Sequence, residues 1–408
     1  MQDYESDGRG QPPYNPLMMT KLILYSYCIG QPSSRKIEKR AYEDIAFRYL
    51  AAGNFPDHDT ICEFRRRHLD ELSRLFVQVL QLCMEAGLVK MGHIALDGTK
   101  VKANASKHKA MSYGRMCIKE RELEELVRGI FEEAERIDEE EDRKYGKGKR
   151  GDELPEELRF HESRLRKIKE AKKALEEKAE RKAKEEGKID DDGNPLPRRG
   201  RKPKHPPGRP RPKDQRNFTD PESRIMKHPT CKGGFIQGYN SQAAVEQESQ
   251  VIVAADVTNE SNDKRQIETM VEQMERNLGK IPEELSADAG YYSESNLRYL
   301  KRRNIDAYIP TDKMRHRKMD VGPSPGRMPK GLNAADRMRR KLGTEKGRKA
   351  YSIRKETVEP VFGQTKEVRG FRQFLLRGLE NVQREWKLIC IGHNVLKLFR
   401  SGYVFRET

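Results

Sequence analysis

The stretch Ile94-Ala95-Leu96-Asp97-Gly98-Thr99-Lys100 decides the fold. Three apolar residues before an acid are typical of a buried β-strand, and the glycine after the acid favours a turn, with a second short strand expected at residues 101–103. A similar pattern recurs in Leu285-Ser286-Ala287-Asp288-Ala289-Gly290. A third acid, Glu359, lies beside apolar residues on a predicted helix. The sequence therefore predicts two acids at strand ends and one on a helix.

Acids in such positions suit a divalent metal. Mg²⁺ takes one or two carboxylates and completes its shell with water and substrate phosphate. Two ions about 3.5 to 4 Å apart can activate an attacking oxygen and stabilise the leaving one in phosphodiester chemistry. Each acid also has a plainer explanation, because Asp-Gly is an ordinary turn pair and an acid such as Glu359 suits the first turn of a helix. The metal hypothesis therefore requires the fold to bring the acids together.

The composition favours a polyanionic partner. Of the 408 residues, 35% are hydrophobic and 36% are charged, so much of the chain is expected outside any core. The formal net charge of +17 favours nucleic acid, although a ribosomal or membrane-surface protein would share this balance. The six cysteines lack zinc-ligand spacing, and no stretch approaches the roughly 18 apolar residues of a membrane span. We expect reduced thiols and a soluble cytoplasmic protein without a membrane partner or a signal peptide.

Residues 1–90 predict a helical domain for DNA binding or dimerisation. Apolar residues at helical spacing indicate one helix within residues 16–29, and a second is expected from residue 33 or 34 to about residue 53. The sequence Thr60-Ile61-Cys62-Glu63 has the form of a capping box that opens a third helix, continuing to Gly87. The first turns of this helix carry Arg65, Arg66 and Arg67. Arginines at this place are compatible with a helix-turn-helix that contacts DNA. An ordinary helical bundle with solvated arginines explains the pattern equally well.

Residues 111–192 predict an inserted helical hairpin. Glu, Lys and Arg dominate this part of the chain, and apolar residues recur three and four positions apart in two runs. The first run carries Leu123, Val127, Ile130, Ala134 and Ile137, and the second carries Leu158, Leu165, Ile168, Leu175 and Ala179. A protruding antiparallel coiled-coil arm fits this pattern. A solvated single helix or a disordered segment remains the alternative.

Residues 193–215 predict a basic, proline-rich linker. Between residues 197 and 216 nine Lys or Arg stand against one Asp, and the prolines exclude a helix. An extended cationic segment of this kind fits a narrow A·T minor groove, with Arg201, Lys202, Arg209 and Arg211 as candidate contacts. The plainer alternative is a linker that touches phosphate without sequence preference. Both predict binding to double-stranded DNA that weakens as salt rises.

Residues 91–110 and 216–408 predict one catalytic domain. Strands are expected at 242–246 and 251–257, joined by a turn at 247–250, and then a helix at 263–278, the strand before Asp288, a helix at 293–302, a strand at 306–309 and a largely helical tail. This order is that of a ribonuclease H-like α/β fold, a mixed sheet flanked by helices. The central strands of such a sheet end side by side. Asp97 and Asp288 are therefore expected to be neighbours although they are 191 positions apart, with Glu359 brought across by the C-terminal helix.

With these motifs in this order, the sequence resembles the DDE-type insertion-sequence transposases of bacteria over nearly its whole length. Residues 95–100, 287–291 and 358–366 carry the resemblance. In these enzymes a Lys follows the catalytic Glu by seven positions, as Lys366 follows Glu359. A Tyr and an Arg precede that Glu at fixed distances. Tyr351 and Arg354 each lie one residue further away than the pattern expects, and Lys355 occupies the expected Arg position. The resemblance implies that these four residues, Tyr351, Arg354, Lys355 and Lys366, contact DNA.

The resemblance also implies an activity. Asp97, Asp288 and Glu359 would hold Mg²⁺, with Mn²⁺ as a substitute, to cut DNA at transposon ends and then join the freed 3′ hydroxyl to target DNA. The implied partners are the terminal inverted repeats, the target DNA and further copies of the chain, as a homodimer or higher homo-oligomer in the bacterial nucleoid. Residues 313–349, with thirteen Lys or Arg against three acids, are an expected DNA-binding surface. The alternatives are an inactive transposase-derived DNA-binding protein and a ribonuclease H-like nuclease that cuts without joining.

Overall fold

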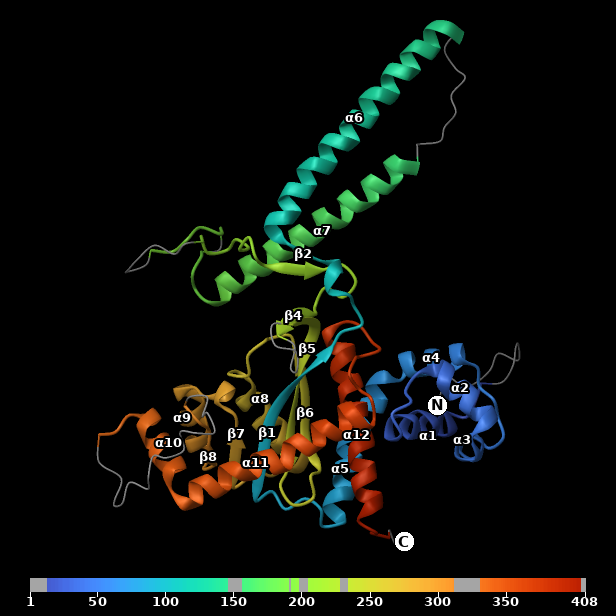
Figure 1. The fold of residues 1–408 in the computed structure, drawn as a ribbon. Helices are drawn as coiled ribbons and strands as arrows, with labels where there is room; N and C mark the ends of the chain where they lie inside the picture. Colours follow the sequence, from blue (N-terminus) through green and yellow to red (C-terminus); the bar gives the residue numbers. More distant parts are fainter. Residues whose placement is uncertain are drawn as a thin grey trace. The chain divides into compact units, whose positions relative to one another are not determined.

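The computed structural model describes residues 13–145, 156–190, 192–197, 205–227, 234–311 and 331–404. The chain divides into two compact units (Figure 1). One consists of Met1–Asn104 with Ile225–Thr408, and the other of Ala105–Arg224. Arg201, Lys202 and the first part of the predicted basic surface at 313–349 lie outside the described residues.

From residue 13 onward, where the description begins, five helices precede the sheet, and their bounds differ from those predicted. They are α1 (Pro16–Cys28), α2 (Ser34–Glu43), α3 (Ile45–Leu50), α4 (His58–Arg67) and α5 (Leu69–Glu85). The predicted second helix is broken at Asp44, whose backbone is extended and whose carboxylate accepts from Ala46 N at 2.9 Å. The predicted capping box is wrong, because α4 starts three residues earlier than a Thr60 cap would place it, and Asp57 caps it by accepting from Thr60 N at 2.6 Å. His68 separates α4 from α5.

A six-stranded mixed sheet forms the centre of the first unit. Its order is β4-β5-β1-β7-β8, with β6 pairing β5, and the bounds are β1 (His93–Lys102), β4 (Arg224–Lys227), β5 (Phe235–Glu246), β6 (Ile252–Thr258), β7 (Glu284–Ala287) and β8 (Asp306–Tyr308). β1 is antiparallel to β5 and parallel to β7, and β7 is parallel to β8. β5 and β6 form the predicted hairpin. The expected mixed α/β sheet is therefore present.

The predicted turn at Gly98 is wrong. β1 runs through it as one strand of ten residues, paired with β5 from Ile94↔Glu246 to Lys102↔Gly238. The glycine has a packing reason instead, since a Cβ at this position would lie 2.5 Å from Gln242 Nε2 and 2.9 Å from Asp263 Oδ1. The predicted strand at 101–103 is the continuation of β1. Asp97 consequently lies in the middle of a strand.

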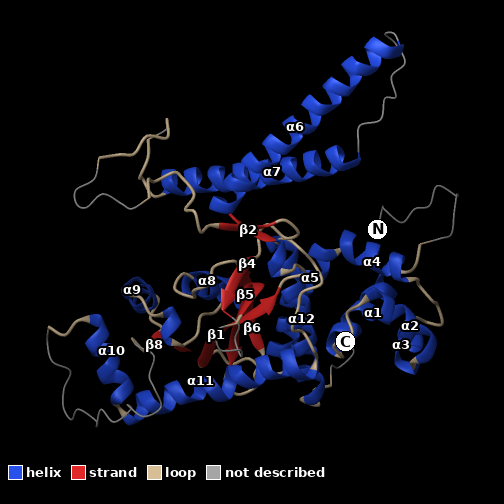
Figure 2. Ribbon diagram, turned by 45° about the horizontal axis from the view of Figure 1, so that its top comes forward, coloured by secondary structure: helices blue, strands red, loops and turns tan. Residues whose placement is uncertain are grey.

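Helices enclose the sheet (Figure 2). They are α8 (Gln266–Leu278), α9 (Glu294–Arg302), α10 (Ala334–Gly343), α11 (Glu345–Gly363) and α12 (Leu379–Arg400), and α11 continues into a π-helical turn, η4 (Gln364–Val368). α11 packs on β1 and β7, and α12 packs on β6, α5 and α1. Trp386 of α12 is buried and donates to Gln242 O at 2.9 Å. Asn394 accepts from Ile252 N at 2.9 Å and donates to Ile252 O at 2.8 Å, so its amide pairs with β6 as a neighbouring strand would.

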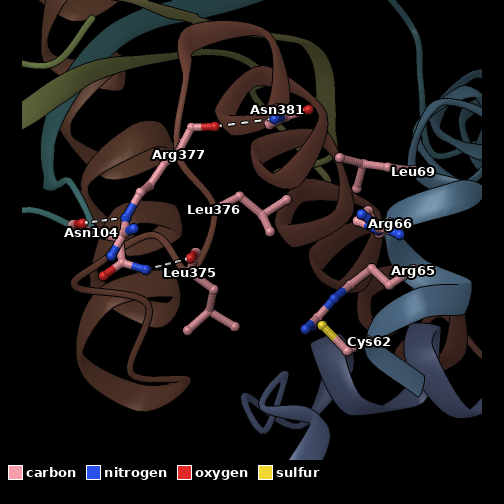
Figure 3. Close-up of a pocket in the computed structure, with 9 residues that line it drawn as sticks. All are labelled: Cys62, Arg65, Arg66, Leu69, Asn104, Leu375, Leu376, Arg377 and Asn381. Atoms are coloured by element: carbon pink, nitrogen blue, oxygen red, sulfur yellow. Dashed lines mark hydrogen bonds between the residues drawn. The ribbon is translucent and has the colours of Figure 1, made fainter. Parts of the chain in front are cut away.

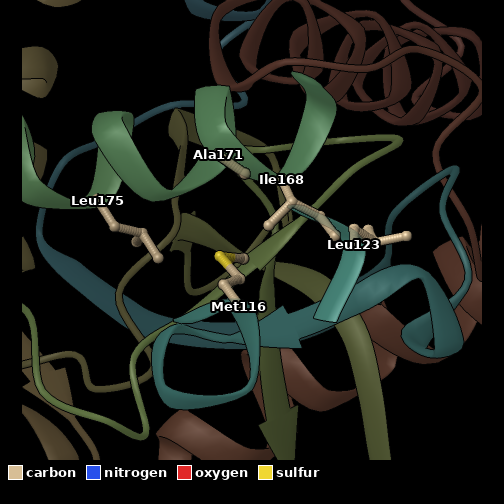
Figure 4. Close-up of a cluster of buried hydrophobic side chains, with 5 residues drawn as sticks. All are labelled: Met116, Leu123, Ile168, Ala171 and Leu175. Atoms are coloured by element: carbon tan, nitrogen blue, oxygen red, sulfur yellow. The ribbon is translucent and has the colours of Figure 1, made fainter. Parts of the chain in front are cut away.

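The second unit contains the inserted helices. β2 (Ala110–Ser112) pairs with β3 (Gln215–Asn217), and in the sequence α6 (Tyr113–Tyr145) and α7 (Glu156–Glu185) come between these two strands. α6 and α7 pack through a buried cluster, shown in Figure 4, of Met116, Leu123, Ile168, Ala171 and Leu175. Lys172 pairs with Glu120 at 2.7 Å and Lys169 with Glu124 at 2.6 Å. The side chains of Ala134, Ile137 and Leu158, also predicted in the apolar seam, lie outside the described residues.

The described part of the basic segment forms turns where an extended strand was expected. Asp214 accepts from Arg211 N at 2.8 Å, and its own N–H donates to Arg211 O at 2.9 Å. Gly208 has a φ of +79° and lies against Ile189. Among all described helices, none is long and apolar enough to cross a bilayer.

Candidate active site

Two of the predicted acids lie on neighbouring strands. The parallel pairing of β1 with β7 ends at Leu96↔Ala287, so Asp97 and Asp288 are the next residues on the two strands. Asp288 follows β7 directly and caps a short 3₁₀ turn, η3 (Ala289–Tyr291), by accepting from Gly290 N at 2.7 Å. The register of a parallel pair thus brings together two residues that are remote in the sequence.

The environment of Asp97 is buried and anionic. The pKa of Asp97 is raised to about 6, chiefly by burial. The charge of Arg354 and the N–H of Gly98 lower the pKa, and the charges of Asp288 and Asp263 raise it. Arg354 Nη1 lies 2.5 Å from Asp97 Oδ2, and both side chains are largely buried. The guanidinium of α11 therefore balances an acid that would otherwise be an isolated charge.

Glu359 lies on α11, C-terminal to Arg354. Its neighbours Val358 and Val361 are buried against the sheet, while Glu359 itself is exposed. Among the described residues, no group of three or more His, Cys, Asp or Glu side chains is arranged to hold a metal ion. Two adjacent carboxylates nevertheless fit Mg²⁺, which accepts one or two and takes water and phosphate at its other positions.

Sequence reasoning missed a further acid that interacts with this pair. Asp263 lies in the loop between β6 and α8, and it interacts with both Asp97 and Lys100. The polar run at 259–263 marks a loop, but acids are common in loops and nothing in the run distinguishes this one. Lys100 lies in the stretch from Ile94 to Lys100, but the sequence pattern predicts no function for it.

The cations predicted to contact DNA lie along α11 and η4. Lys366 Nζ donates to Lys100 O at 2.8 Å, and burial lowers its pKa to about 8. The Arg354 guanidinium lies 5.8 Å from the centre of the Tyr351 ring. Lys355 is half-buried. In α10, Lys341 of the predicted basic surface is not solvated, because it pairs with Asp306 and donates to Ala307 O at 2.8 Å.

The three arginines of α4 differ from one another. They lie in its last turn, not its first. Arg65 is buried and donates to Pro32 O at 2.6 Å and Ser34 Oγ at 3.0 Å, so it ties α4 to the start of α2 and its guanidinium is occupied by the fold. Arg66 and Arg67 are exposed and both pair with Glu63.

A cavity of about 480 Å³ lies beside these arginines (Figure 3). Its lining consists of Cys62, Arg65, Arg66, Leu69, Asn104, Leu375, Leu376, Arg377 and Asn381. Arg377 Nε donates to Asn104 O at 3.0 Å, and Asn104 Nδ2 donates to Leu375 O at 2.7 Å, so several of the polar groups at its rim already bond within the protein. In the second unit, Arg209 and Arg211 are both exposed.

A mixed sheet with acids at adjacent positions on two central parallel strands is the arrangement of a ribonuclease H-like enzyme. Residues 192–395, half of the chain, match the family model described as "Transposase DDE domain", and residues 1–67 match the "Transposase domain (DUF772)". The chain belongs to the DDE transposases of insertion sequences. Comparisons with curated proteins and with solved structures gave no significant match. Membership of this family implies a DNA substrate and an enzyme of transposition.

Proposed function

We propose that the protein uses a divalent metal to cut DNA at transposon ends and to join the freed 3′ ends to target DNA. The adjacency of Asp97 and Asp288, set by the register of β1 and β7, carries the proposal. Their carboxylates would hold Mg²⁺ or Mn²⁺, and a bound ion supplies Lewis-acid activation of the attacking and leaving oxygens. Repulsion between the two acids disfavours the metal-free form, because like charges this close destabilise each other.

Glu359 is proposed as the third acid. It lies on α11, the helix that packs on β1 and β7 and supplies the Arg354 partner of Asp97. Its exposure leaves the carboxylate accessible to a metal ion or to DNA. The spacing of seven residues to Lys366 supports the assignment by resemblance to the family.

Cationic side chains around the pair would bind the DNA backbone. Arg354, Lys355 and Lys366, with the Tyr351 hydroxyl, are proposed contacts near the cut. More distant phosphates would be bound by the exposed arginines, namely Arg66, Arg67, Arg209 and Arg211. Arg65 is proposed to act by positioning α4. The polyanionic substrate accounts for the net charge of +17, and one protomer for each transposon end would require a homodimer or a larger assembly on DNA.

Cleavage of a duplex that carries one transposon end tests this function. In Mg²⁺ or Mn²⁺ the wild type should cut the duplex, and Asp97→Asn and Asp288→Asn should each lower the rate at least about a thousandfold while DNA binding changes little. The Glu359→Gln variant should lose cleavage as well. Its matched control is Glu356→Gln, an exposed glutamate three residues earlier on the same helix, which should cut normally.

Three outcomes would revise the proposal. A wild type that binds the end but never cuts it would be an inactive DNA-binding protein. Cutting without joining of precut ends to target DNA would indicate a nuclease. Normal cleavage by Glu359→Gln, together with its loss in Asp97→Asn, would remove Glu359 from the site.

A further inference from the structure

A lysine and a third carboxylate interact electrostatically with the Asp97–Asp288 pair. Lys100 is three residues after Asp97 on β1, and its Nζ lies 3.8 Å from Asp263 Oδ1. The side chains of Lys100 and Asp263 are 19% and 18% exposed. Both groups are therefore largely shielded from water yet reachable from outside.

The Asp263 carboxylate is fixed by two buried amides of β5. Its Oδ1 accepts from Asn240 Nδ2 at 2.6 Å and from Gln242 Nε2 at 2.8 Å. In the β1–β5 register Asn240 is opposite Lys100 and Gln242 is opposite Gly98, so these positions share one face of the ladder. Gln242 is itself held, because it accepts from the Tyr291 hydroxyl. The sheet thus dictates where Asp263 lies.

Asp263 also touches the backbone next to both acids. A Cβ at Gly98 would lie 2.9 Å from Asp263 Oδ1, and a Cβ at Gly290 would lie 3.3 Å from Asp263 Oδ2. These glycines come one residue after Asp97 and two after Asp288. Lys100 interacts electrostatically with all three carboxylates, which raise its pKa against a larger lowering by burial. A single ammonium group therefore faces the cluster of three acids.

We propose that Lys100 contacts the scissile phosphodiester and that Asp263 is a positioning residue that holds Lys100 beside Asp97 and Asp288. The inference rests on the proposed function and deepens it. A cluster of three carboxylates repels a phosphate, and an ammonium within the cluster offers a charge-assisted hydrogen bond to a non-bridging oxygen. In phosphoryl transfer the charge spreads over these oxygens, so a fixed donor there stabilises the transition state.

The ion pair is suited to this role because it is loose. A separation of 3.8 Å is longer than an ordinary hydrogen bond, so the Lys100 ammonium can turn toward a phosphate by giving up only a weak contact with Asp263. Asp263 keeps its two amide bonds while this happens. The carboxylate thereby restrains the lysine without satisfying its N–H groups.

Kinetics of four variants and one control variant test the proposal. Lys100→Gln should lower the cleavage rate at saturating DNA about a hundredfold, the usual effect of removing one transition-state donor, while the Kd for end-bearing DNA changes less than about threefold. Lys100→Arg should restore part of the rate. Asp263→Asn should reduce the rate less than Lys100→Gln, and the double variant should be no slower than Lys100→Gln alone, because the two residues act through one contact. Lys102→Gln, an exposed lysine on the same strand, is the control and should cut normally.

Wild-type rates in Lys100→Gln would overturn the role of Lys100, and additive effects in the double variant would overturn that of Asp263. If Asp97→Asn abolishes cleavage while Lys100→Gln does not, the further inference alone fails. A second readout does not need cleavage. A duplex with an abasic-site aldehyde next to the scissile phosphate, trapped with cyanoborohydride, should cross-link to Lys100 in the wild type and more weakly in Asp263→Asn. Cross-linking elsewhere, with none at Lys100, would contradict the proposal.

Discussion

Burial acts in opposite directions on two ionisable groups of the core. It raises the pKa of Asp97 to about 6 and lowers that of His393 to about 3, because each environment disfavours the charged form. Asp97 has a cationic partner in Arg354. In α12, the Nε2 of His393 lies 2.8 Å from Gln250 O. The nearby positive charges of Arg369, Lys397 and Arg400 disfavour protonation of the His393 imidazole.

His393 should make the protein acid-sensitive. Its folded pKa of about 3 lies below the ordinary value of 6.5, so between these pH values the unfolded chain binds more protons and the free energy of unfolding falls as pH falls. The loss is at most about 1.4 kcal/mol per pH unit, or about 2 to 3 kcal/mol at pH 4.5. Urea unfolding between pH 7 and pH 4.5 measures it.

The His393→Gln variant isolates this effect. Its free energy of unfolding should fall less with pH than that of the wild type, whatever the absolute cost of the substitution. His58→Gln, at a partly exposed histidine of α4, should retain the wild-type slope. Parallel curves for the wild type and His393→Gln would mean that His393 does not carry the acid sensitivity.

Among the secondary-structure elements, α12 bonds to the sheet through the Asn394 amide as well as through Trp386. Asn394 supplies the donor and the acceptor that Ile252 of β6 would otherwise lack on that side. Asn394→Ala leaves two buried backbone groups unpaired, each costing about 1 to 3 kcal/mol. Denaturant unfolding should therefore show that the free energy of unfolding of Asn394→Ala is lower by roughly 2 to 5 kcal/mol. The control is Asn381→Ala, on the exposed side of the same helix, which should lower the free energy of unfolding by under about 1 kcal/mol. A cost for Asn394→Ala as small as that of the control would refute the pairing.

The elements also show what the sequence could predict. Apolar runs and turn residues were sufficient to predict the β5–β6 hairpin and the end of β7 before Asp288. They were also sufficient to predict the order of these strands along the chain. The turn at Gly98 failed because Asp-Gly is a local signal, and pairing with β5 along the whole of β1 overrides it. The start of α4 was missed because Asp57 and Thr60 are both good caps and the structure uses the earlier one.

The candidate site was only partly predictable for a similar reason. The end of β7 gives the position of Asp288, and the parallel register of β1 with β7 places Asp97 next to it although Asp97 lies within β1. The burial of Arg65, the contact of Arg354 with Asp97 and the approach of Asp263 depend on side chains from remote segments. The spacing of residues in the sequence does not predict those contacts.

The molecule as a whole accommodates a large insertion without disturbing its sheet. Ala105–Arg224 forms its own compact unit between β1 and β5, and those two strands still pair along nine consecutive positions. In the sequence, the insertion begins after the last residue of β1 and ends before the first residue of β5. The acids of β1 and β7 therefore meet regardless of the intervening residues, and the activity proposed here depends on that meeting.

Binding of Mn²⁺ to the whole protein, measured by electron paramagnetic resonance with end-bearing DNA present, tests the Asp97–Asp288 pair most directly. The account predicts that the wild type binds the ion and that Asp97→Asn and Asp288→Asn each weaken binding at least about tenfold, as expected for loss of a ligand or its close support. Asp256→Asn, at a half-buried acid of β6 outside the site, should bind as the wild type does. Wild-type Mn²⁺ affinity in both Asp97→Asn and Asp288→Asn would contradict the account.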